Sequence, residues 1–512
     1  MLMNTKLSLF LTRYRIILMI FAAFICTAFM QANSAFMILD HQRQTAFFVL
    51  LFFAYFTLGF FLLKYKKLST EAKVFLIILG GVILRSFYVV FTGLGDRQHD
   101  EGYFTGLSDN RINPGHLGYI EYLCKFGHLP DFSPYKLFSY YHPPLHHIIA
   151  CLFIDLQLLL GVTEALAFEN IQALTLLYSS LCLPVAYGIL KKIKCSDTGM
   201  LLGISLITFH PGMIYMSGST NNDMLCTLLT FLCFYLALHW LENKSFRNLM
   251  LIAITLGFGM ITKLNCAVMA FPLAAVFLLH FISECKNRNA LKAIRDYAVF
   301  LIVTAGIGLS WVIRNLVFYK TNPGVPVLTE SSIQYIGKFS FWDIFGIPAH
   351  YGIDYPFHTL NGEQICNSWL ILFRTSLFDE IRPDLSDVLL TLCRIALILA
   401  MLLGTAFFFI TIAMQIREIR NGDRELGIFL LTGYTAVVVT FIAFIIKYPY
   451  TCSANYRYVV VGLLFTAISL LQLCDKPRIH STAHRIFAAI IHYGIFSLLA
   501  ILVPILLVWN QW

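Results

Sequence analysis

The chain has 512 residues, of which 58% are hydrophobic and 13% are charged, and its formal net charge is +9. So large an apolar fraction excludes an ordinary soluble domain of this length, because the excess apolar surface needs lipid to cover it. Lys and Arg kept in cytoplasmic loops explain the positive charge, and no RNA-binding pattern accompanies it, so nucleic acid is not expected as a partner.

The chain opens with a basic segment and a long apolar run at residues 16–36. This run is too long for the core of a signal peptide, so we expect a retained first membrane helix. Further candidate spans lie at 46–63, 73–94, 171–190, 199–216, 222–241, 248–262, 265–283, 296–317, 387–414, 425–446, 458–474 and 485–509. The sequence therefore predicts an all-α polytopic membrane protein with about thirteen transmembrane helices.

Basic clusters between these stretches set the orientation, because short loops rich in Lys and Arg stay in the cytoplasm. They lie at 64–67, 191–194, 244–247, 286–295, 417–424 and 476–485. The N-terminus is then inside and the C-terminus outside. This assignment requires that residues 142–161, which open with a proline pair and contain three histidines, Asp155 and Gln157, lie at the outer interface without crossing.

Two polar stretches, 94–141 and 319–384, are long outer loops in this topology, and loops of this length are usually functional. The first of these loops is the first large outer loop, and we expect it to contain interfacial helices. The predicted divisions are a three-helix segment, an outer catalytic loop, a membrane core, a second outer loop and the C-terminal helices, at 1–94, 95–170, 171–317, 318–385 and 386–512.

Two adjacent carboxylates, Asp100 and Glu101, stand near the start of the first outer loop. Two adjacent carboxylates beside lipid are energetically costly unless they form ion pairs or bind a ligand. One of them is a candidate general base that takes the proton of an acceptor as it attacks an activated carbon. The alternative is a solvated loop start in which Arg97 neutralises the acids.

The same loop ends in Tyr141, His142 and Pro143-Pro144-Leu145. The first proline biases His142 toward extended backbone, and a proline in the first turn suits the start of a helix. Such a start presents free N–H groups and suits a phosphate, to which His142 adds a donor or a cation. The alternative is a plain helix cap with an interfacial histidine.

Lys263 and Arg457 lie at turns that the topology places outside, against the usual distribution of positive charge. Both suit a lipid phosphate, and Arg457 can bind two phosphate oxygens at once. The alternatives are a snorkelling lysine and an interfacial anchor. The polar turn before Asn222 and Asp223 is dense in donors, although Asn222 also suits a helix N-cap.

Together these motifs resemble those of the GT-C glycosyltransferases, in the protein O-mannosyltransferase and aminoarabinose-transferase branch (family 39 and its relatives). That branch has an acid pair at the start of its first outer loop, a Pro-Pro-Leu motif at its end, a Thr-Lys turn and a late Arg-Tyr. The matching residues here are Asp100-Glu101, His142-Pro143-Pro144-Leu145, Thr262-Lys263 and Arg457-Tyr458, over about residues 75–475.

The resemblance implies transfer of a sugar, with inversion, from a polyprenyl-phosphate-linked donor. Asp100 is then the base beside Glu101, and His142, Lys263, Arg457 and Arg97 bind the donor phosphate. Tyr141, Asn222, Asp223 and Tyr458 are the candidate substrate-binding residues. The acceptor is a glycan, a lipid or a protein, and the membrane is the plasma membrane of a bacterium or the endoplasmic reticulum of a eukaryote, with the site on the extracytoplasmic face.

The chain departs from the branch in having three predicted spans before the loop and His146-His147 after the Pro-Pro-Leu motif. A polyprenyl-lipid transporter is the first alternative, although the spans carry few acids. A metal-dependent hydrolase using His99, Asp100 and the later histidines is the second, but no HExxH is present and neither a cofactor nor a divalent metal is expected.

The cysteines contain no CxxC pair, which argues against a zinc or redox site. Most of them, Cys151 included, lie in apolar runs and are expected to behave as small buried hydrophobes. Cys124, Cys366 and Cys452 fall in outer segments, so a Cys124–Cys366 or a Cys366–Cys452 bridge is compatible with the topology.

Overall fold

The computed structural model describes residues 2–32, 41–65, 68–94, 102–193, 196–321, 324, 329–347, 355–380, 385–474 and most of 489–498. The part so described is helical, and its strand-like pairing is an isolated bridge between Tyr335 and Tyr450. The all-α prediction is therefore confirmed for these residues.

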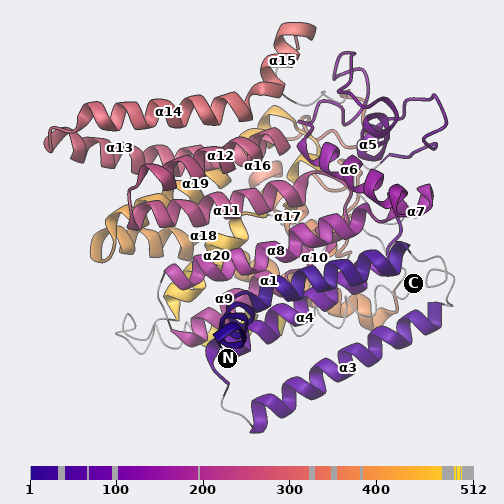
Figure 1. Cartoon of the computed structure of the whole chain (residues 1–512), viewed down its shortest axis with the longest axis horizontal. Coiled ribbons are helices and arrows are strands. Elements are labelled where there is room, and N and C mark those ends of the chain that lie inside the picture. The colour runs from indigo at the N-terminus through magenta and orange to yellow at the C-terminus, as the bar shows by residue number, and fades with distance from the viewer. Residues whose placement is uncertain are drawn as a thin grey trace.

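Long helices packed side by side make up most of the molecule (Figure 1). They are α1 (Leu2–Ala32), α3 (His41–Tyr65), α4 (Thr70–Val90), α8 (Ile171–Lys192), α9 (Asp197–Phe209), α11 (Asp223–Glu242), α12 (Phe246–Thr262), α13 (Ala270–Lys286), α14 (Ala290–Gly308), α18 (Asp387–Asn421), α19 (Arg424–Lys447) and α20 (Gly462–Leu473). Among them α11 packs on α8 and α12, and α18 packs on α19. Leu and Ile from nearly all of these helices share one buried apolar cluster.

Shorter helices occupy the connections. They are α5 (Gly115–Phe126), α6 (Leu145–Leu159), α7 (Glu164–Glu169), α10 (Pro211–Tyr215), α15 (Ser310–Tyr319), α16 (Phe341–Phe345) and α17 (Ser368–Phe378), with 3-10 turns η1 (Met216–Gly218), η2 (Leu264–Met269), η3 (Thr451–Ala454) and η4 (Tyr456–Tyr458). Figure 1 shows α5, α6 and α7 gathered at one end of the long helices.

Seven helices in the described part are long and apolar enough to cross a membrane, or up to nine if each of two bent pairs counts as one span. Helices also occupy the expected spans 46–63, 248–262 and 458–474, but the apolar stretch 46–62 within α3 and the helices of 246–262 and 462–473 are shorter than a full span. Most of the expected last span, 485–509, lies outside the described residues. The total of about thirteen therefore stays a prediction.

A buried arginine supports one of the two breaks. The chain bends by 52° between α9 and α10, where Pro211 has no N–H to continue the helix. Arg85 in α4, which is fully buried, donates to the carbonyl of Thr208 at 2.9 Å and to the Ser179 hydroxyl at 2.9 Å. These bonds give the buried guanidinium partners at two of its nitrogens and satisfy a carbonyl that the broken helix leaves open.

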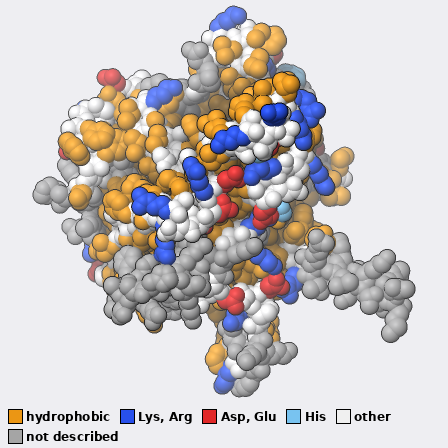
Figure 2. Space-filling model, turned by 90° about the vertical axis from the view of Figure 1, so that its left-hand side faces the viewer, with side chains coloured by type: hydrophobic (Ala, Val, Ile, Leu, Met, Phe, Trp, Pro, Cys, Tyr) orange, Lys and Arg blue, Asp and Glu red, His pale blue; other side chains and the backbone are white. Residues whose placement is uncertain are grey.

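The predicted cytoplasmic loops meet at the end opposite α5, α6 and α7. Lys191 pairs with Glu71 at 2.9 Å, and Lys244 pairs with Glu425 at 2.7 Å. Figure 2 looks onto this end and shows Lys and Arg side chains gathered on it among fewer acids. The basic loops thus share one end of the molecule, as the positive-inside rule requires of cytoplasmic loops.

Helix α6 has both of its ends at the other end of the molecule. Gln157 near its C-terminus accepts a bond from Asn170 at 2.7 Å, and Asn170 is followed by α8, which runs from there to Lys191. Glu169 beside it accepts a bond from the backbone N–H of Leu94, just past the end of α4, at 3.2 Å. This arrangement supports an α6 that lies along one end of the helices without crossing them.

Candidate functional site

A cavity of about 390 Å³ opens at the end of the molecule where α6 begins. Its walls come from segments far apart in the sequence: the first outer loop, the α11 start, the α12–η2 turn, α15 and the η4 turn. Six residues predicted from the sequence line it together: Tyr141, His142, Asp223, Lys263, Arg457 and Tyr458. The fold thus collects into one site motifs that span more than 300 positions of the chain.

Breaks in helices place the polar side chains of this cavity. Helix α11 begins at Asp223, and α12 ends immediately before Lys263, whose backbone is extended (φ −159°, ψ 132°). Asn222 stands at the N-cap position of α11, but its side chain makes no cap bond and instead donates to the carbonyl of Thr262 at 2.6 Å. Asn222 therefore joins the two helix ends that present Asp223 and Lys263.

Two cations surround one carboxylate in the cavity wall. Lys263 forms an ion pair with Asp223, and the guanidinium of Arg457 lies 4.0 Å from the other oxygen of the same carboxylate. Both cations also face the Tyr458 ring, each 5.2 Å from its centroid. Lys263 is only 7% exposed, so it is neither a snorkelling lysine nor a solvated one. The group has one positive charge in excess, which suits an anionic ligand.

His142 joins the cavity as a neutral group. Its ring stacks on that of His116, with centroids 4.9 Å apart, and His116 in turn shares a hydrogen bond of 2.8 Å with His147. Burial and the nearby charges of Lys263 and Arg457 hold the pKa values of His116 and His142 well below the usual range. Of the two roles expected for His142, a donor or a cation, this direction favours the neutral hydrogen-bonding group.

The Pro-Pro-Leu motif forms a helix start, as predicted. Helix α6 begins at Leu145, directly after the proline pair, and Pro143 also lines the cavity. The second histidine after the motif, His147, faces the His116 ring in parallel at 5.1 Å. His146 points elsewhere and bonds the carbonyl of Thr220 at 2.9 Å. His146 and His147 thus support the cavity from behind.

Aromatic side chains form much of the remaining wall. The indole N–H of Trp311, in α15, donates to the carbonyl of Tyr141 at 3.2 Å. Tyr135 and Tyr448 line the cavity near them, together with Asn265, Asn315 and Lys447. The sequence analysis missed these residues and His116. An aromatic residue beside a membrane helix is too common for its sequence position alone to indicate a site.

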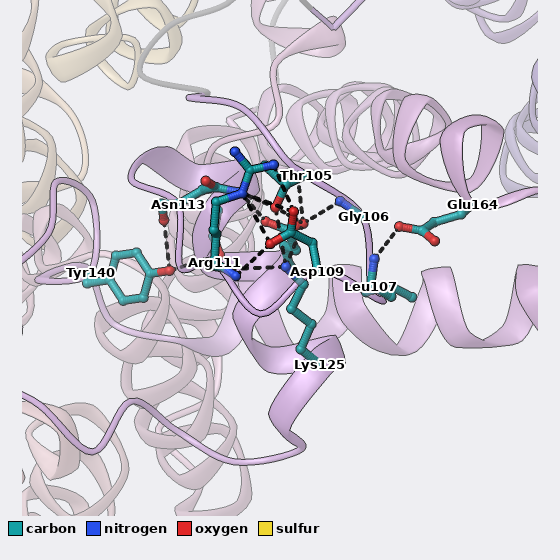
Figure 3. Close-up of polar contacts among 11 residues, drawn as sticks. Thr105, Gly106, Leu107, Asp109, Arg111, Asn113, Lys125, Tyr140 and Glu164 are labelled. Atoms are coloured by element: carbon teal, nitrogen blue, oxygen red, sulfur yellow. Dashed lines mark hydrogen bonds and ion pairs between the residues drawn. The ribbon is translucent and has the colours of Figure 1, made fainter.

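The predicted acids Asp100 and Glu101, together with Arg97, lie outside the described residues. The described part of the chain resumes at Gly102. A carboxylate of α5 accepts hydrogen bonds from the loop that follows, which contains Thr105 and Gly106 (Figure 3). Glu121 of α5, which is 1% exposed, accepts from the backbone N–H groups of Thr105 and Gly106 at 2.7 and 2.8 Å. The start of this loop, a few residues from the acid pair, is therefore fixed on α5.

Further bonds complete this anchor. Lys125, one helical turn along α5, pairs with Glu121 at 3.0 Å, and the side chain of Asn113 donates to the other carboxylate oxygen at 2.7 Å. Tyr140 donates to the carbonyl of Asn113 at 2.9 Å and so connects the anchor to the end of the loop that carries His142. Figure 3 shows Lys125 reaching from α5 toward the loop that carries Thr105, and Tyr140 beside Asn113.

Among the described residues, Cys124, Cys151 and Asp155 form a group with the spacing of metal ligands, and none of them lines the cavity. Of the histidines in the hydrolase alternative, His146 and His147 are engaged with Thr220 and His116, and His99 lies outside the described residues.

Comparison with known proteins agrees with the class that the motifs indicate. Residues 141–311, which include His142, Asp223 and Lys263, match the family model described as dolichyl-phosphate-mannose-protein mannosyltransferase. The resemblance to GT-C transferases of the mannosyltransferase type is thereby confirmed over this part of the chain. A search of curated proteins gave no match.

Solved structures of membrane glycosyltransferases are similar in outline. The apo oligosaccharyltransferase of Archaeoglobus fulgidus aligns with a TM-score of 0.44 and 13% identity, over 88% of this chain and 57% of its own. ArnT of Cupriavidus metallidurans aligns with a TM-score of 0.34 and 12% identity, over 78% of this chain and 76% of its own. The chain thus spans little more than half of the archaeal enzyme.

Proposed function

We propose that this chain is a membrane glycosyltransferase that moves a sugar from a polyprenyl-phosphate-linked donor to an acceptor on the extracytoplasmic face. One observation carries the proposal: residues singled out separately from the sequence for phosphate binding, Lys263 and Arg457, surround one carboxylate in a single cavity with Tyr141 and His142. The family model over residues 141–311 supports the same class.

The charges of the site suit the leaving group of such a reaction. As the bond between the anomeric carbon and the phosphate oxygen breaks, a phosphodiester with one negative charge becomes a phosphomonoester with up to two. Cations placed beside that oxygen stabilise the transition state more than the bound donor, which is the requirement for catalysis. In this proposal Lys263 and Arg457 have that role, and His142 contributes a neutral donor.

The nucleophile needs a base on the opposite side of the sugar. We assign this role to Asp100, with Glu101 beside it, and the attack inverts the anomeric carbon. The base removes the proton of the acceptor hydroxyl or amine while the new bond forms and the phosphate leaves. The Glu121 anchor holds Thr105 and Gly106, in the loop that follows these acids in the chain.

A second cavity, of about 300 Å³, provides a place for the prenyl chain. It shares Asp223, Arg457 and Tyr458 with the first cavity, so the two lie side by side. Beyond them it is lined by apolar residues of η2, α13 and α19 and of the turn before α20, among them Val268, Phe271, Val437, Phe441, Val460 and Val461. A lipid with its phosphate at Lys263 can extend its chain along this wall.

Exchange of the acid pair tests the proposal. Asp100→Asn should lower turnover with a polyprenyl-phosphate sugar by on the order of 10²–10⁴ while donor binding is kept, because only the proton acceptor is lost. Glu101→Gln is the matched control and should lower it less. Near-normal transfer by Asp100→Asn would remove the assignment of the base. Binding of the donor with movement of the intact lipid and no transfer, in the unmodified protein, would favour a transporter instead.

A further inference from the structure

Two cysteines from different helices of the first outer segment face each other. Cys124 lies near the end of α5 and Cys151 in the middle of α6, and these two helices pack together. Their sulfur atoms are 2.7 Å apart. Cys151 is buried, and Cys124 is partly exposed. Of the two bridges considered from the sequence, Cys124–Cys366 does not fit this arrangement, because the Cys124 thiol faces Cys151, while Cys366–Cys452 stays a prediction.

The separation of the sulfur atoms decides between a metal site and a bond. Asp155 lies near both thiols, and the three side chains could in principle hold a metal ion. Two thiolates on one tetrahedral zinc ion, each about 2.3 Å from it, stand roughly 3.7 Å apart. Even carbon atoms, which are smaller than sulfur, rest about 3.5–4.0 Å apart when they are not bonded. Thiols held within 2.7 Å need only a small movement to bond.

We propose that Cys124 and Cys151 form a disulfide that joins α5 to α6. Each thiol loses a proton and an electron, and the two sulfur atoms bond. The electrons and protons pass to the disulfide of a thiol oxidoreductase, which becomes a dithiol. The location rests on the proposed function, which puts these helices in an extracytoplasmic compartment where such oxidants act.

The bridge lies behind the cavity and fixes its wall. Helix α5 carries His116 at its start and the Glu121 anchor on its next turns, while α6 follows His142 and carries His147. The contacts of His116 with His142 and His147 therefore depend on how α5 sits on α6. A covalent bond between the two helices keeps these rings in register without occupying the site itself.

Peptide mapping of the full-length protein tests the bond directly. The protein is purified without reductant, its free thiols are alkylated in denaturant, and it is digested with trypsin. Cleavage after Arg111, Lys125 and Lys136 puts Cys124 in peptide 112–125 and Cys151 in peptide 137–191. We expect these two peptides to be found joined, and to separate when a reductant is added.

Matched variants identify the partner, because peptide 137–191 also contains Cys182 of α8. Cys182→Ser should leave the joined peptides unchanged, whereas Cys151→Ser should abolish them. Alkylation of both Cys124 and Cys151 in the unreduced protein would overturn the disulfide, as would stoichiometric zinc that is lost with Cys151→Ser.

The result can be separated from the proposed function. If both thiols are free, an impermeant maleimide is added to intact cells carrying a cysteine at Ser108, which is exposed in the same outer loop. Labelling of this cysteine from outside would agree with the proposed extracytoplasmic site and contradict only the disulfide. Labelling only after the membrane is opened would contradict both proposals.

Discussion

At the scale of single residues, the buried ion pair between Lys263 and Asp223 is the central feature of the cavity. Lys263 sits inside the protein with Asp223 as its partner, whereas a lysine at the membrane surface would extend to water. A buried ion pair contributes little net stability, because desolvation offsets the attraction. Its position beside a cavity with a second cation, Arg457, supports the proposed role in binding an anion.

The buried His146 gives a prediction for pH dependence. Burial lowers its pKa to about 4 from a usual value near 6.5. Because the unfolded chain binds this proton more readily, protonation favours unfolding. The contribution of neutral His146 to the free energy of unfolding is therefore complete above about pH 6.5 and is lost as the pH falls toward 4. The loss from this residue is on the order of 3 kcal/mol. Thermal unfolding in detergent should show it, and His146→Phe should flatten the fall. An equal fall in that variant would contradict this assignment.

Sequence reasoning found the charged residues of the site better than its histidines and aromatics. Lys263 and Arg457 violate a general rule of membrane topology, so their positions alone indicate a special role. His116 and Trp311 violate no such rule, and only the packing of α5 and α15 brings them to the cavity. The protonation of His142 could not be predicted either, because it depends on burial and on charges that are remote in the sequence.

At the scale of elements, α5 and α6 form a platform from which the first outer loop is held. Glu121 is the centre of this platform, since it satisfies two backbone N–H groups, an amide and a buried ammonium at once. The helix start at the Pro-Pro-Leu motif could be predicted because proline restricts the backbone locally. The anchor could not, because its partners are unremarkable residues until the loop folds back on α5.

Glu121→Leu tests the anchor. It leaves Lys125 buried without its partner and removes the acceptor of three donors, which costs about 3–5 kcal/mol locally. The loop should detach, so trypsin should cut at Arg111 faster and turnover should fall with donor binding kept. Lys125→Met in addition should restore part of the stability.

The matched control is Glu363→Leu, which breaks the exposed pair of Glu363 with Lys338. This variant should change stability, tryptic cleavage at Arg111 and turnover only slightly, since solvent already screens that pair. Equal effects of the two leucine variants would show that the buried carboxylate is not an anchor.

At the scale of the whole molecule, the account depends on which ends of the helices share a side of the membrane. The ion pairs Lys191–Glu71 and Lys244–Glu425 gather the basic loops at one end, and the cavity opens at the other. Charge distribution predicted this division from the sequence. The number of spans is harder to predict, because a helix as short as α20 or α6 can cross, dip or lie flat according to its neighbours.

Cysteine labelling tests the sidedness. Single cysteines at Ser108 and Ser331, both exposed, should react with an impermeant reagent added outside, in a background without other accessible thiols. A cysteine at the exposed Asn243 should react only after the membrane is opened. If the cysteine at position 108 reacts from outside and the one at position 331 reacts only after the membrane is opened, α6 crosses the membrane.

The binding of a polyprenyl phosphate to the purified protein tests the central claim most directly. Lys263→Ala and Arg457→Ala should each weaken binding by roughly 1.5–3 kcal/mol, because each removes a charge-assisted bond to the phosphate. Lys263→Arg should keep most of the affinity, and Lys338→Ala, which removes an exposed lysine, should keep all of it. Unchanged affinity in both alanine variants, with folding intact, would mean that the cavity does not hold the donor phosphate.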